Sequence, residues 1–314
     1  MSFSLDKISY DGVSLTVTVF QEELTDFAFY VLLAGKKLDT KWYSLDTTSS
    51  LDISLLVGKT YSLILFFRPN AEKTIEEEKV VKKFFFKVNE DHSTKVFSNN
   101  ILFESENFKI TEYDQGSDIT FVTFNSAHTD KTSSPFGGDF ILSEGWNLIS
   151  VQKDNRNQYQ DLNLDLFESV VKPKIIGKRT YIYGTSLGGY SSIYYGGIID
   201  ATIIAGAPML SLISKRNHPR YRDIQYKHIP IKDTKKTSEP VFIIYDPLVG
   251  GDINFIKKNV LPAYPLAHFI PVKKGTHLVM KTLIEKKILK DIIRDLVRHN
   301  SFDAINRIAI AMEQ

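Results

Sequence analysis

The chain has 314 residues, enough for two ordinary domains or one large one, and its 43% hydrophobic and 24% charged residues are typical of a globular protein. A formal net charge of +2 gives no global field that would favour nucleic acid as a partner. Cysteine is absent, which excludes disulfides, cysteine nucleophiles and thiolate metal sites.

The order of the residues also argues against a membrane-spanning protein and against a secreted one. No uninterrupted apolar run is long enough to cross a bilayer. The first ten residues lack the basic-then-apolar layout of a signal peptide. We therefore expect a cytoplasmic protein without a membrane span, and nothing in the sequence calls for a metal or another cofactor.

The first part of the chain, to about residue 89, reads as a series of short strands. Residues 13–20 alternate with period two, and runs rich in aromatic and branched side chains follow at 27–33, 61–67 and 80–88. Turn-forming residues separate these runs, and no long helical period intervenes. The pattern predicts a small antiparallel β-sandwich, immunoglobulin-like in outline, over residues 1–95.

A polar stretch at 90–100 reads as the linker to a region in which strands and helices alternate. Strands are expected at 108–113, 119–124, 146–151, 180–183, 201–205, 241–245 and 268–272, and helices at 161–171, 190–195, 252–260, 278–298 and 301–314. The alternation predicts an α/β domain over residues 96–314, with a mostly parallel sheet covered by helices on both faces. Its site is expected beyond the carboxyl ends of the strands.

A candidate nucleophile lies between one expected strand and the helix that follows. Residues 184–188 read Gly-Thr-Ser-Leu-Gly, and Gly189 comes next. Strand, sharp turn and helix are the context in which Gly-x-Ser-x-Gly forms a nucleophile elbow. A serine at so tight a turn has strained backbone, and a Cβ on either flank would collide with the neighbouring strand or helix. Ser186 is therefore the expected nucleophile.

A serine hydroxyl needs a base to take its proton, normally a histidine that a buried carboxylate orients. His277 lies in the loop between the last expected strand and the long helix after it, where the base belongs in the chain order serine, acid, histidine. Two carboxylates compete for the role of the acid. Asp246 directly follows the penultimate strand and is preferred, because Asp252 also reads as the N-cap of the next helix.

Attack at a carbonyl creates an oxyanion, which needs preorganised hydrogen-bond donors. The first expected donor is the backbone N–H of Leu187, directly after the nucleophile and at a helix N-terminus. The second is expected from the loop after the strand at 119–124. Asn125, the first residue of that loop, is assigned to this role by its position.

Basic and aromatic residues gather in an insert at about 208–240, between two of the expected strands. They are Lys215, Arg216, Arg220, Tyr221, Arg222, Tyr226, Lys227 and Lys232. Placed over the strand ends, the insert would cap the substrate pocket and suit an acidic or sugar-bearing substrate. An exposed lysine-rich loop is the alternative interpretation, and the sequence leaves both open.

With these residues in place, the region 100–298 resembles an α/β-hydrolase. The stretch 183–196, Tyr-Gly-Thr-Ser-Leu-Gly-Gly-Tyr-Ser-Ser-Ile-Tyr-Tyr-Gly, and the Ala-Gly-Ala-Pro at 205–208 resemble one branch more closely. That branch is associated with bacterial capsule and glycan-modification loci and includes the accessory-secretion acetyltransferases, several with a β-sandwich before the hydrolase domain. The acid loop at 246–252 departs from the usual hydrolase loop.

The residues and the resemblance together lead to three hypotheses. The first is a serine-dependent carboxylic ester hydrolase, with O-acyl groups on a bacterial surface polysaccharide or its precursor as candidate substrates. The second is an O-acyltransferase of capsule or glycan biosynthesis that uses the same residues. The third is a non-catalytic glycan-binding or scaffold protein. A second copy of the chain and glycan-assembly proteins are the candidate partners.

Overall fold

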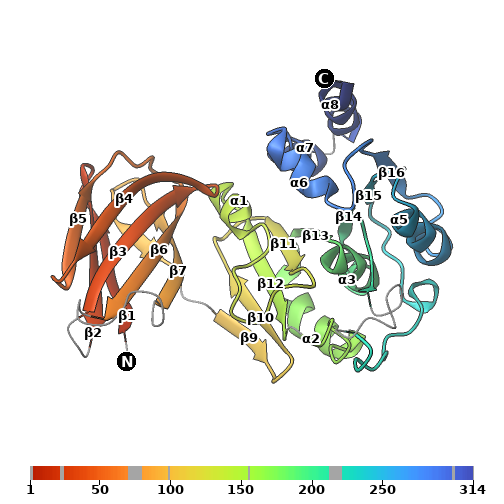
Figure 1. Cartoon of the computed structure of the whole chain (residues 1–314), viewed down its shortest axis with the longest axis horizontal. Helices are drawn as coiled ribbons and strands as arrows, with labels where there is room; N and C mark the ends of the chain where they lie inside the picture. Colours follow the sequence, from red (N-terminus) through yellow and green to blue (C-terminus); the bar gives the residue numbers. More distant parts are fainter. Residues whose placement is uncertain are drawn as a thin grey trace. The chain divides into compact units, whose positions relative to one another are not determined.

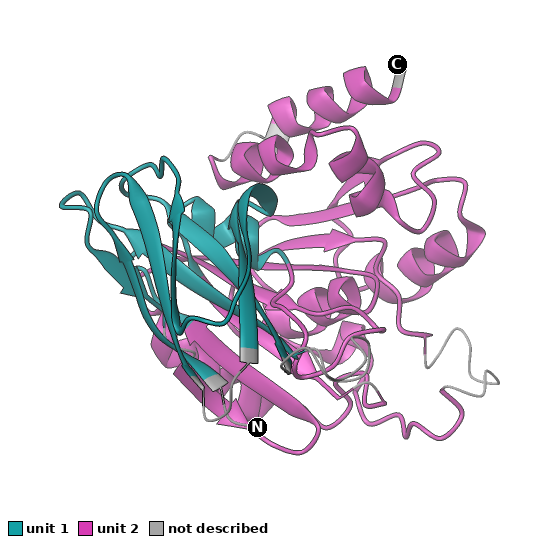
Figure 2. Ribbon diagram, turned by 60° about the vertical axis from the view of Figure 1, so that its left-hand side comes forward, with its two compact units in different colours: residues 1–99, 113–117, 137–147 teal, residues 100–112, 118–136, 148–314 magenta. Residues whose placement is uncertain are grey.

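The chain divides into two compact units, coloured separately in Figure 2. The structure, a computed structural model, describes residues 3–21, 25–69, 80–97, 100–154, 156–211, 221–298 and 301–313. Unit 1 comprises residues 1–99, 113–117 and 137–147, and unit 2 comprises residues 100–112, 118–136 and 148–314. Three pieces of chain therefore build unit 1, where the sequence predicted a single boundary at 95/96.

Unit 1 contains two antiparallel sheets, and Figure 1 labels their strands β1 to β7. The first has the order β1-β2-β5 and consists of β1 (Phe3–Tyr10), β2 (Ser14–Gln21) and β5 (Thr48–Asp52). The second has the order β4-β3-β6-β7-β8 and consists of β4 (Lys36–Ser44), β3 (Thr25–Leu33), β6 (Thr60–Pro69), β7 (Val80–Val88) and β8 (Thr94–Val96).

The two sheets of unit 1 share one buried cluster. Val17 of the first sheet belongs to it, together with Phe29 and Leu63 of the second, and all three are fully buried. Period-two alternation along these strands puts their apolar side chains on one face, and burying that face is what stabilises a sheet. Two antiparallel sheets around one core agree with the expected arrangement, while the immunoglobulin-like outline stays a prediction.

A short helix from later in the chain, α1 (Gly138–Ser143), belongs to unit 1. Its Asp139 carboxylate accepts hydrogen bonds from the Ser62 hydroxyl and, at 2.7 Å, from the Lys83 ammonium. Tyr113, from the other added segment, packs edge-on against Phe85 with ring centroids 5.5 Å apart. These polar and aromatic contacts tie both late segments to strands β6 and β7.

Unit 2 is built on an eight-stranded sheet of order β16-β15-β14-β13-β11-β12-β10-β9. Its strands are β9 (Asn100–Glu104), β10 (Phe108–Tyr113), β11 (Ile119–Phe124), β12 (Asn147–Lys153), β13 (Arg179–Thr185), β14 (Thr202–Gly206), β15 (Val241–Tyr245) and β16 (His268–Pro271). The neighbours from β11 to β16 run parallel, whereas β9 pairs antiparallel with β10. Since parallel strands end at one edge, the segments after β13, β15 and β16 meet there.

Helices lie between the strands of unit 2 and follow the last of them. They are α2 (Leu164–Ile175), α3 (Leu187–Gly196), α5 (Gly250–Phe255) continued by a π-helical turn η2 (Ile256–Val260), α6 (Val279–Glu285), α7 (Leu289–Val297) and α8 (Ser301–Glu313), with a 3₁₀ turn η1 (Ile231–Asp233). The helix predicted at 278–298 is two helices, because the chain turns between them at Lys287, whose φ is 60°. None of the helices in the described ranges is long and apolar enough to cross a membrane.

Candidate active site

Ser186 stands at the turn between β13 and α3, in the strained backbone that the sequence predicts. Its φ of 54° and ψ of −116° lie outside the regions that a non-glycine residue readily adopts. The turn is held on both sides, because the Ser186 N–H donates to Gly206 O at 2.8 Å and the Ser186 carbonyl accepts from Met209 N–H at 3.0 Å. The strain is therefore balanced by hydrogen bonds to the segment at the end of β14.

The glycines around Ser186 allow backbone to meet backbone. A Cβ added to Gly184 would lie 2.3 Å from the Gly188 carbonyl carbon, and one added to Gly188 would lie 2.4 Å from Phe124 O. Real Cβ atoms do not approach backbone so closely, so both positions require glycine. The contact at Phe124 also puts the first turn of α3 beside the carboxyl end of β11.

His277 forms hydrogen bonds with Ser186 on one side and with Asp252 on the other. Its Nε2 lies 2.9 Å from Ser186 Oγ, and its Nδ1 lies 2.8 Å from Asp252 Oδ1 and 3.0 Å from Oδ2. Because a carboxylate only accepts, Nδ1 carries the proton, and Nε2 of the neutral ring is the acceptor facing the hydroxyl. The Asp252 side chain is 1% exposed and that of His277 is 36% exposed. Serine, imidazole and buried carboxylate are thus linked by a continuous series of hydrogen bonds.

The preference for Asp246 as the partner of His277 is corrected by this geometry. Asp246 Oδ2 accepts from the Thr276 N–H at 2.7 Å and Oδ1 from the Leu248 N–H at 2.9 Å, and the residue is 2% exposed. The carboxylate thus holds two backbone loops and does not bind the imidazole. Asp252 is inside the first turn of α5 rather than at the N-cap, which is Val249. One turn of helix directs Asp252 toward the histidine.

Of the two expected oxyanion donors, Leu187 is available and Asn125 is not. Leu187 is the first residue of α3, and the first N–H groups of a helix have no intrahelical acceptor. The Asn125 N–H donates to Val151 O at 3.3 Å, while its side chain binds Ser134 O at 3.0 Å and the Phe136 N–H at 2.9 Å. Asn125 therefore shapes its loop, which corrects its assignment as a donor.

Ser126, the residue after Asn125, has a backbone N–H that the sequence did not single out. Within the described part of the chain, the Ser126 N–H donates no hydrogen bond. The carbonyl of the same peptide, Asn125 O, lies 3.1 Å from the buried Tyr159 hydroxyl, whose one hydrogen is shared with Val151 O at 3.0 Å. Since N–H and C=O of a trans peptide point in opposite directions, the Ser126 N–H is directed away from Tyr159.

His228 anchors the predicted cap insert to the helix that follows the nucleophile. Its Nε2 lies 2.8 Å from Tyr159 O and must donate there, so Nδ1 accepts from the Tyr190 hydroxyl at 2.8 Å. Burial lowers the pKa of His228 to about 4, so the ring is neutral at pH 7. It also stacks on the Tyr194 ring at 4.1 Å. The neutral His228 thus joins the insert to α3 through a hydrogen bond and a ring contact.

The basic character of the insert is only partly visible. Lys215, Arg216 and Arg220 lie outside the described residues. Lys227 pairs with Asp161, and Arg222 lies 3.5 Å from Asp223. The two tyrosines differ, since Tyr221 is buried and Tyr226 is 45% exposed. A cap that recognises an acidic or sugar-bearing substrate stays a prediction.

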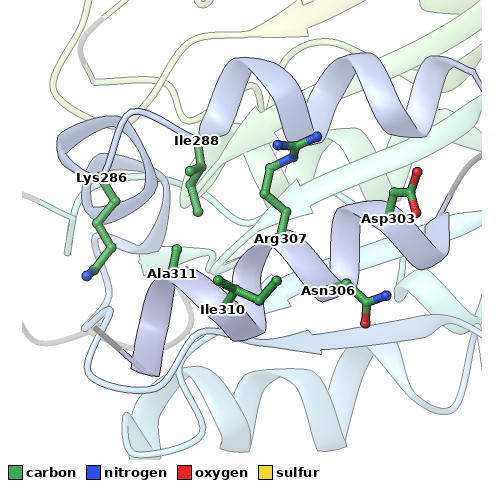
Figure 3. A pocket seen from close by; sticks show the side chains of 7 residues that line it. All are labelled: Lys286, Ile288, Asp303, Asn306, Arg307, Ile310 and Ala311. Carbon is green, nitrogen blue, oxygen red and sulfur yellow. The ribbon is translucent and has the colours of Figure 1, made fainter.

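A separate cavity of about 480 Å³ lies in unit 2 beside α8, and Figure 3 shows the side chains that line it. They are Lys286, Ile288, Asp303, Asn306, Arg307, Ile310 and Ala311, so neither Ser186, His277 nor Asp252 contributes to it. Among the described residues, no group of three or more histidine, aspartate or glutamate side chains is arranged to hold a metal ion.

Comparisons with known proteins give similarities in structure only. No family model and no curated protein matches the chain. The capsule O-acetyltransferase of Neisseria meningitidis serogroup A is 17% identical, with a TM-score of 0.46 over 60% of this chain and 93% of that one. XC6422 from Xanthomonas campestris, a serine hydrolase described as having no lid, is 12% identical, with a TM-score of 0.41 over 64% and 97%. A bromoperoxidase from Bacillus anthracis is 12% identical, with a TM-score of 0.42 over 64% and 99%. The similarity of the chain to these three proteins is one of structure.

Proposed function

We propose that this chain is a serine-dependent carboxylic ester hydrolase, with Ser186 as nucleophile, His277 as base and Asp252 as the carboxylate that orients it. One observation carries the proposal: the unbroken hydrogen-bond chain from Ser186 Oγ through the imidazole to the buried Asp252. The chain order of serine, acid and histidine, and the strained elbow, support the same reading. A nucleophile, a base and an orienting group within hydrogen-bond reach are the requirements for covalent catalysis.

In the first half of the reaction, Ser186 Oγ attacks the acyl carbonyl carbon while its proton moves to His277 Nε2. Negative charge develops on the carbonyl oxygen, and the N–H groups of Leu187 and Ser126 are the proposed donors to it. The tetrahedral intermediate then breaks its bond to the alcohol oxygen, which takes the proton back from Nε2. The alcohol leaves, and the acyl group stays on Ser186 as an ester.

In the second half, His277 takes a proton from water, and the resulting oxygen nucleophile attacks the acyl carbon. The intermediate expels Ser186 Oγ, which recovers the proton from Nε2, and the carboxylic acid leaves. Asp252 stays ionised throughout and stabilises the imidazolium that forms twice. The His277 side chain is 36% exposed, which leaves water a path to the acyl-enzyme and is consistent with hydrolysis.

An O-acyltransferase with the same residues and a non-catalytic glycan-binding protein remain the alternatives, and O-acylated glycans remain the proposed substrate class. Transfer and hydrolysis differ in what resolves the acyl-enzyme, a sugar hydroxyl or water. Incubation with an acyl donor and candidate glycans separates them by product. Free acid as sole product supports hydrolysis, and acylated glycan supports transfer.

The proposed function is tested by turnover of a short-chain aryl ester. Ser186→Ala is expected to lower kcat by about 10⁴-fold or more, since removing the nucleophile leaves only binding and the oxyanion donors. Ser169→Ala, on the exposed face of α2, is the matched control and is expected to keep wild-type turnover. Unchanged turnover in Ser186→Ala would contradict the proposal, and no turnover in the wild type would favour the non-catalytic alternative.

A further inference from the structure

Lys153, the last residue of β12, is fully buried, which is unusual for lysine. No carboxylate of the described residues lies within ion-pair distance of its ammonium. Its Nζ instead lies near three backbone carbonyls: Thr129 O at 2.9 Å, Ala127 O at 3.2 Å and Asp154 O at 3.4 Å. Two of these belong to the loop 125–136, which begins at the end of β11 and includes Ser126.

The number of donors matches the number of acceptors only when Lys153 is protonated. An ammonium has three N–H donors and no lone pair, whereas a neutral amine has two donors and a lone pair that would face a carbonyl oxygen. Burial lowers the pKa of Lys153 to about 8, against the opposing effect of the Asp154 and Asp130 charges. The ammonium is therefore the prevailing form at pH 7, and it loses its proton within an accessible range of pH.

The carbonyls at the start of the loop 125–136 are held one after another. Tyr159 holds the Asn125 carbonyl, and the Thr129 hydroxyl donates to Ser126 O at 2.8 Å. Lys153 holds the next carbonyl, that of Ala127, and the carbonyl of Thr129 itself. The Ser126 N–H lies in the same peptide plane as the Asn125 carbonyl, and the bonds to the carbonyls of Ser126, Ala127 and Thr129 restrain the backbone that follows it.

We infer that Lys153 is a positioning residue for the reaction proposed above: its ammonium holds the loop 125–136 so that the Ser126 N–H stays aimed at the oxyanion. The inference rests on the proposed function, since it concerns an oxyanion donor of that reaction. Lys153 itself touches no reacting atom. It acts through the backbone of Ala127 and Thr129.

Lys153→Met tests the inference, because methionine keeps an unbranched apolar stem and removes the donors. A donor misplaced by about 1 Å lowers the rate by up to about 10²-fold, so we expect a loss of this order in kcat on p-nitrophenyl acetate. An interaction made only in the transition state lowers kcat and kcat/KM equally, so KM should stay unchanged. Lys172→Met, an exposed lysine of α2, is the control and should match the wild type. A kcat within about threefold of the wild type would overturn the inference.

The pH profile is a second readout that a merely structural role would not move. The kcat of the wild type should fall as pH rises through about 8, and Lys153→Met should lack this alkaline fall. If that variant does not fold, the wild-type profile decides alone, with circular dichroism as the check that the protein stays folded. If kcat of the folded wild type stays constant as pH rises above about 8, the inference is overturned. Absence of any wild-type turnover or fluorophosphonate labelling would instead contradict the proposed function.

Discussion

Asp246 and Asp252 follow the same strand and differ in what their oxygens bind. Asp252 accepts from the imidazole of His277, whereas Asp246 accepts from two backbone N–H groups, one of them in the residue before that histidine. Thr276, with φ of 56°, is in the left-handed region, so the loop that carries His277 needs an external hold. At the scale of single residues, one aspartate orients the ring and the other holds its backbone.

Replacing each aspartate by asparagine separates these roles. Asp252→Asn should lower kcat by about 10⁴-fold while folding normally, because an amide beside Nδ1 favours the wrong tautomer of the histidine. Asp246→Asn should mainly destabilise the protein, by about 1–3 kcal/mol, because a backbone N–H would face the amide nitrogen. Kinetics and urea unfolding of both variants measure the two effects. A larger loss of kcat in Asp246→Asn than in Asp252→Asn would contradict this division.

The structure brings Ser186 Oγ and His277 Nε2 within 2.9 Å of each other. The sequence proposed both residues from their position along the chain, at the end of a strand and before a helix. Position along the chain also favoured Asp246, but position alone did not show which aspartate binds the histidine. The direction of a side chain depends on the turn it stands in, and Asp252 is turned toward the histidine by the first turn of α5. The burial of Lys153 was likewise hidden, although a lysine that ends the otherwise uncharged strand Asn147–Lys153 is a visible signal.

At the scale of elements, the nucleophile elbow depends on how closely three segments approach. The carboxyl end of β13, the first turn of α3 and the end of β11 meet at Gly184, Gly188 and Phe124. The parallel pairing of β11 with β13 brings Phe124 opposite Gly184, so the sheet register sets this meeting point. The loop 125–136 therefore begins beside the nucleophile because of register, not because of any residue within the loop.

Gly188→Ala is expected to disrupt the elbow. The added Cβ would lie 2.4 Å from Phe124 O, a backbone atom that cannot move without shifting β11. Overpacking of this kind destabilises by about 1–3 kcal/mol, occasionally more, and it would also displace Ser186. Gly250→Ala in α5 is the matched control, because nothing lies within 4 Å of its added Cβ. Wild-type thermal stability and labelling by fluorophosphonate in Gly188→Ala would contradict the account.

Four strands have the bounds that the sequence predicted, and three of them are almost entirely buried. The strands at 108–113, 119–124, 241–245 and 80–88 have the bounds that the pattern gave. Strand β4 was missed because most of its side chains are exposed, so its sequence, Lys-Lys-Leu-Asp-Thr-Lys-Trp-Tyr-Ser, carries no apolar period. Strands β1 and β5 were also missed. The helix expected at 301–314 is confirmed as α8.

At the scale of the whole molecule, the chain passes between its units more than once. After β10 it enters unit 1 at 113–117, returns for β11 and the loop 125–136, and enters unit 1 again at 137–147 before β12. The sequence could not predict this, because a composition shift marks one boundary along the chain and gives no sign of a later segment that packs on an earlier sheet. Ser62 and Lys83, which bind Asp139, look like ordinary strand residues in isolation.

The buried His228 makes the stability of unit 2 depend on pH. Its pKa is about 4 when folded and about 6.5 in a model peptide, so the unfolded state binds more protons between these values. The stability contribution is therefore complete above pH 6.5 and is lost as pH falls toward 4. From the size of this shift, the free energy of unfolding should fall by roughly 3 kcal/mol across that range.

His228→Gln should remove most of this difference between pH 7 and pH 4.5 in urea unfolding followed by far-ultraviolet circular dichroism. Tryptophan fluorescence is the internal comparison, because Trp42 and Trp146, the two tryptophans of the sequence, both belong to unit 1. An equal pH dependence in the wild type and in His228→Gln would show that His228 is not the group responsible.

Ser186 is the proposed nucleophile of an acyl-transfer reaction, and a covalent adduct on its hydroxyl is the most direct test of this role. The wild type is treated with a fluorophosphonate, digested, and its peptides are analysed by mass spectrometry. We predict a single adduct on Ser186 that forms in step with loss of esterase turnover and is absent from Ser186→Ala. An unlabelled wild type, or an adduct on another residue that accounts for the lost turnover, would contradict the claim.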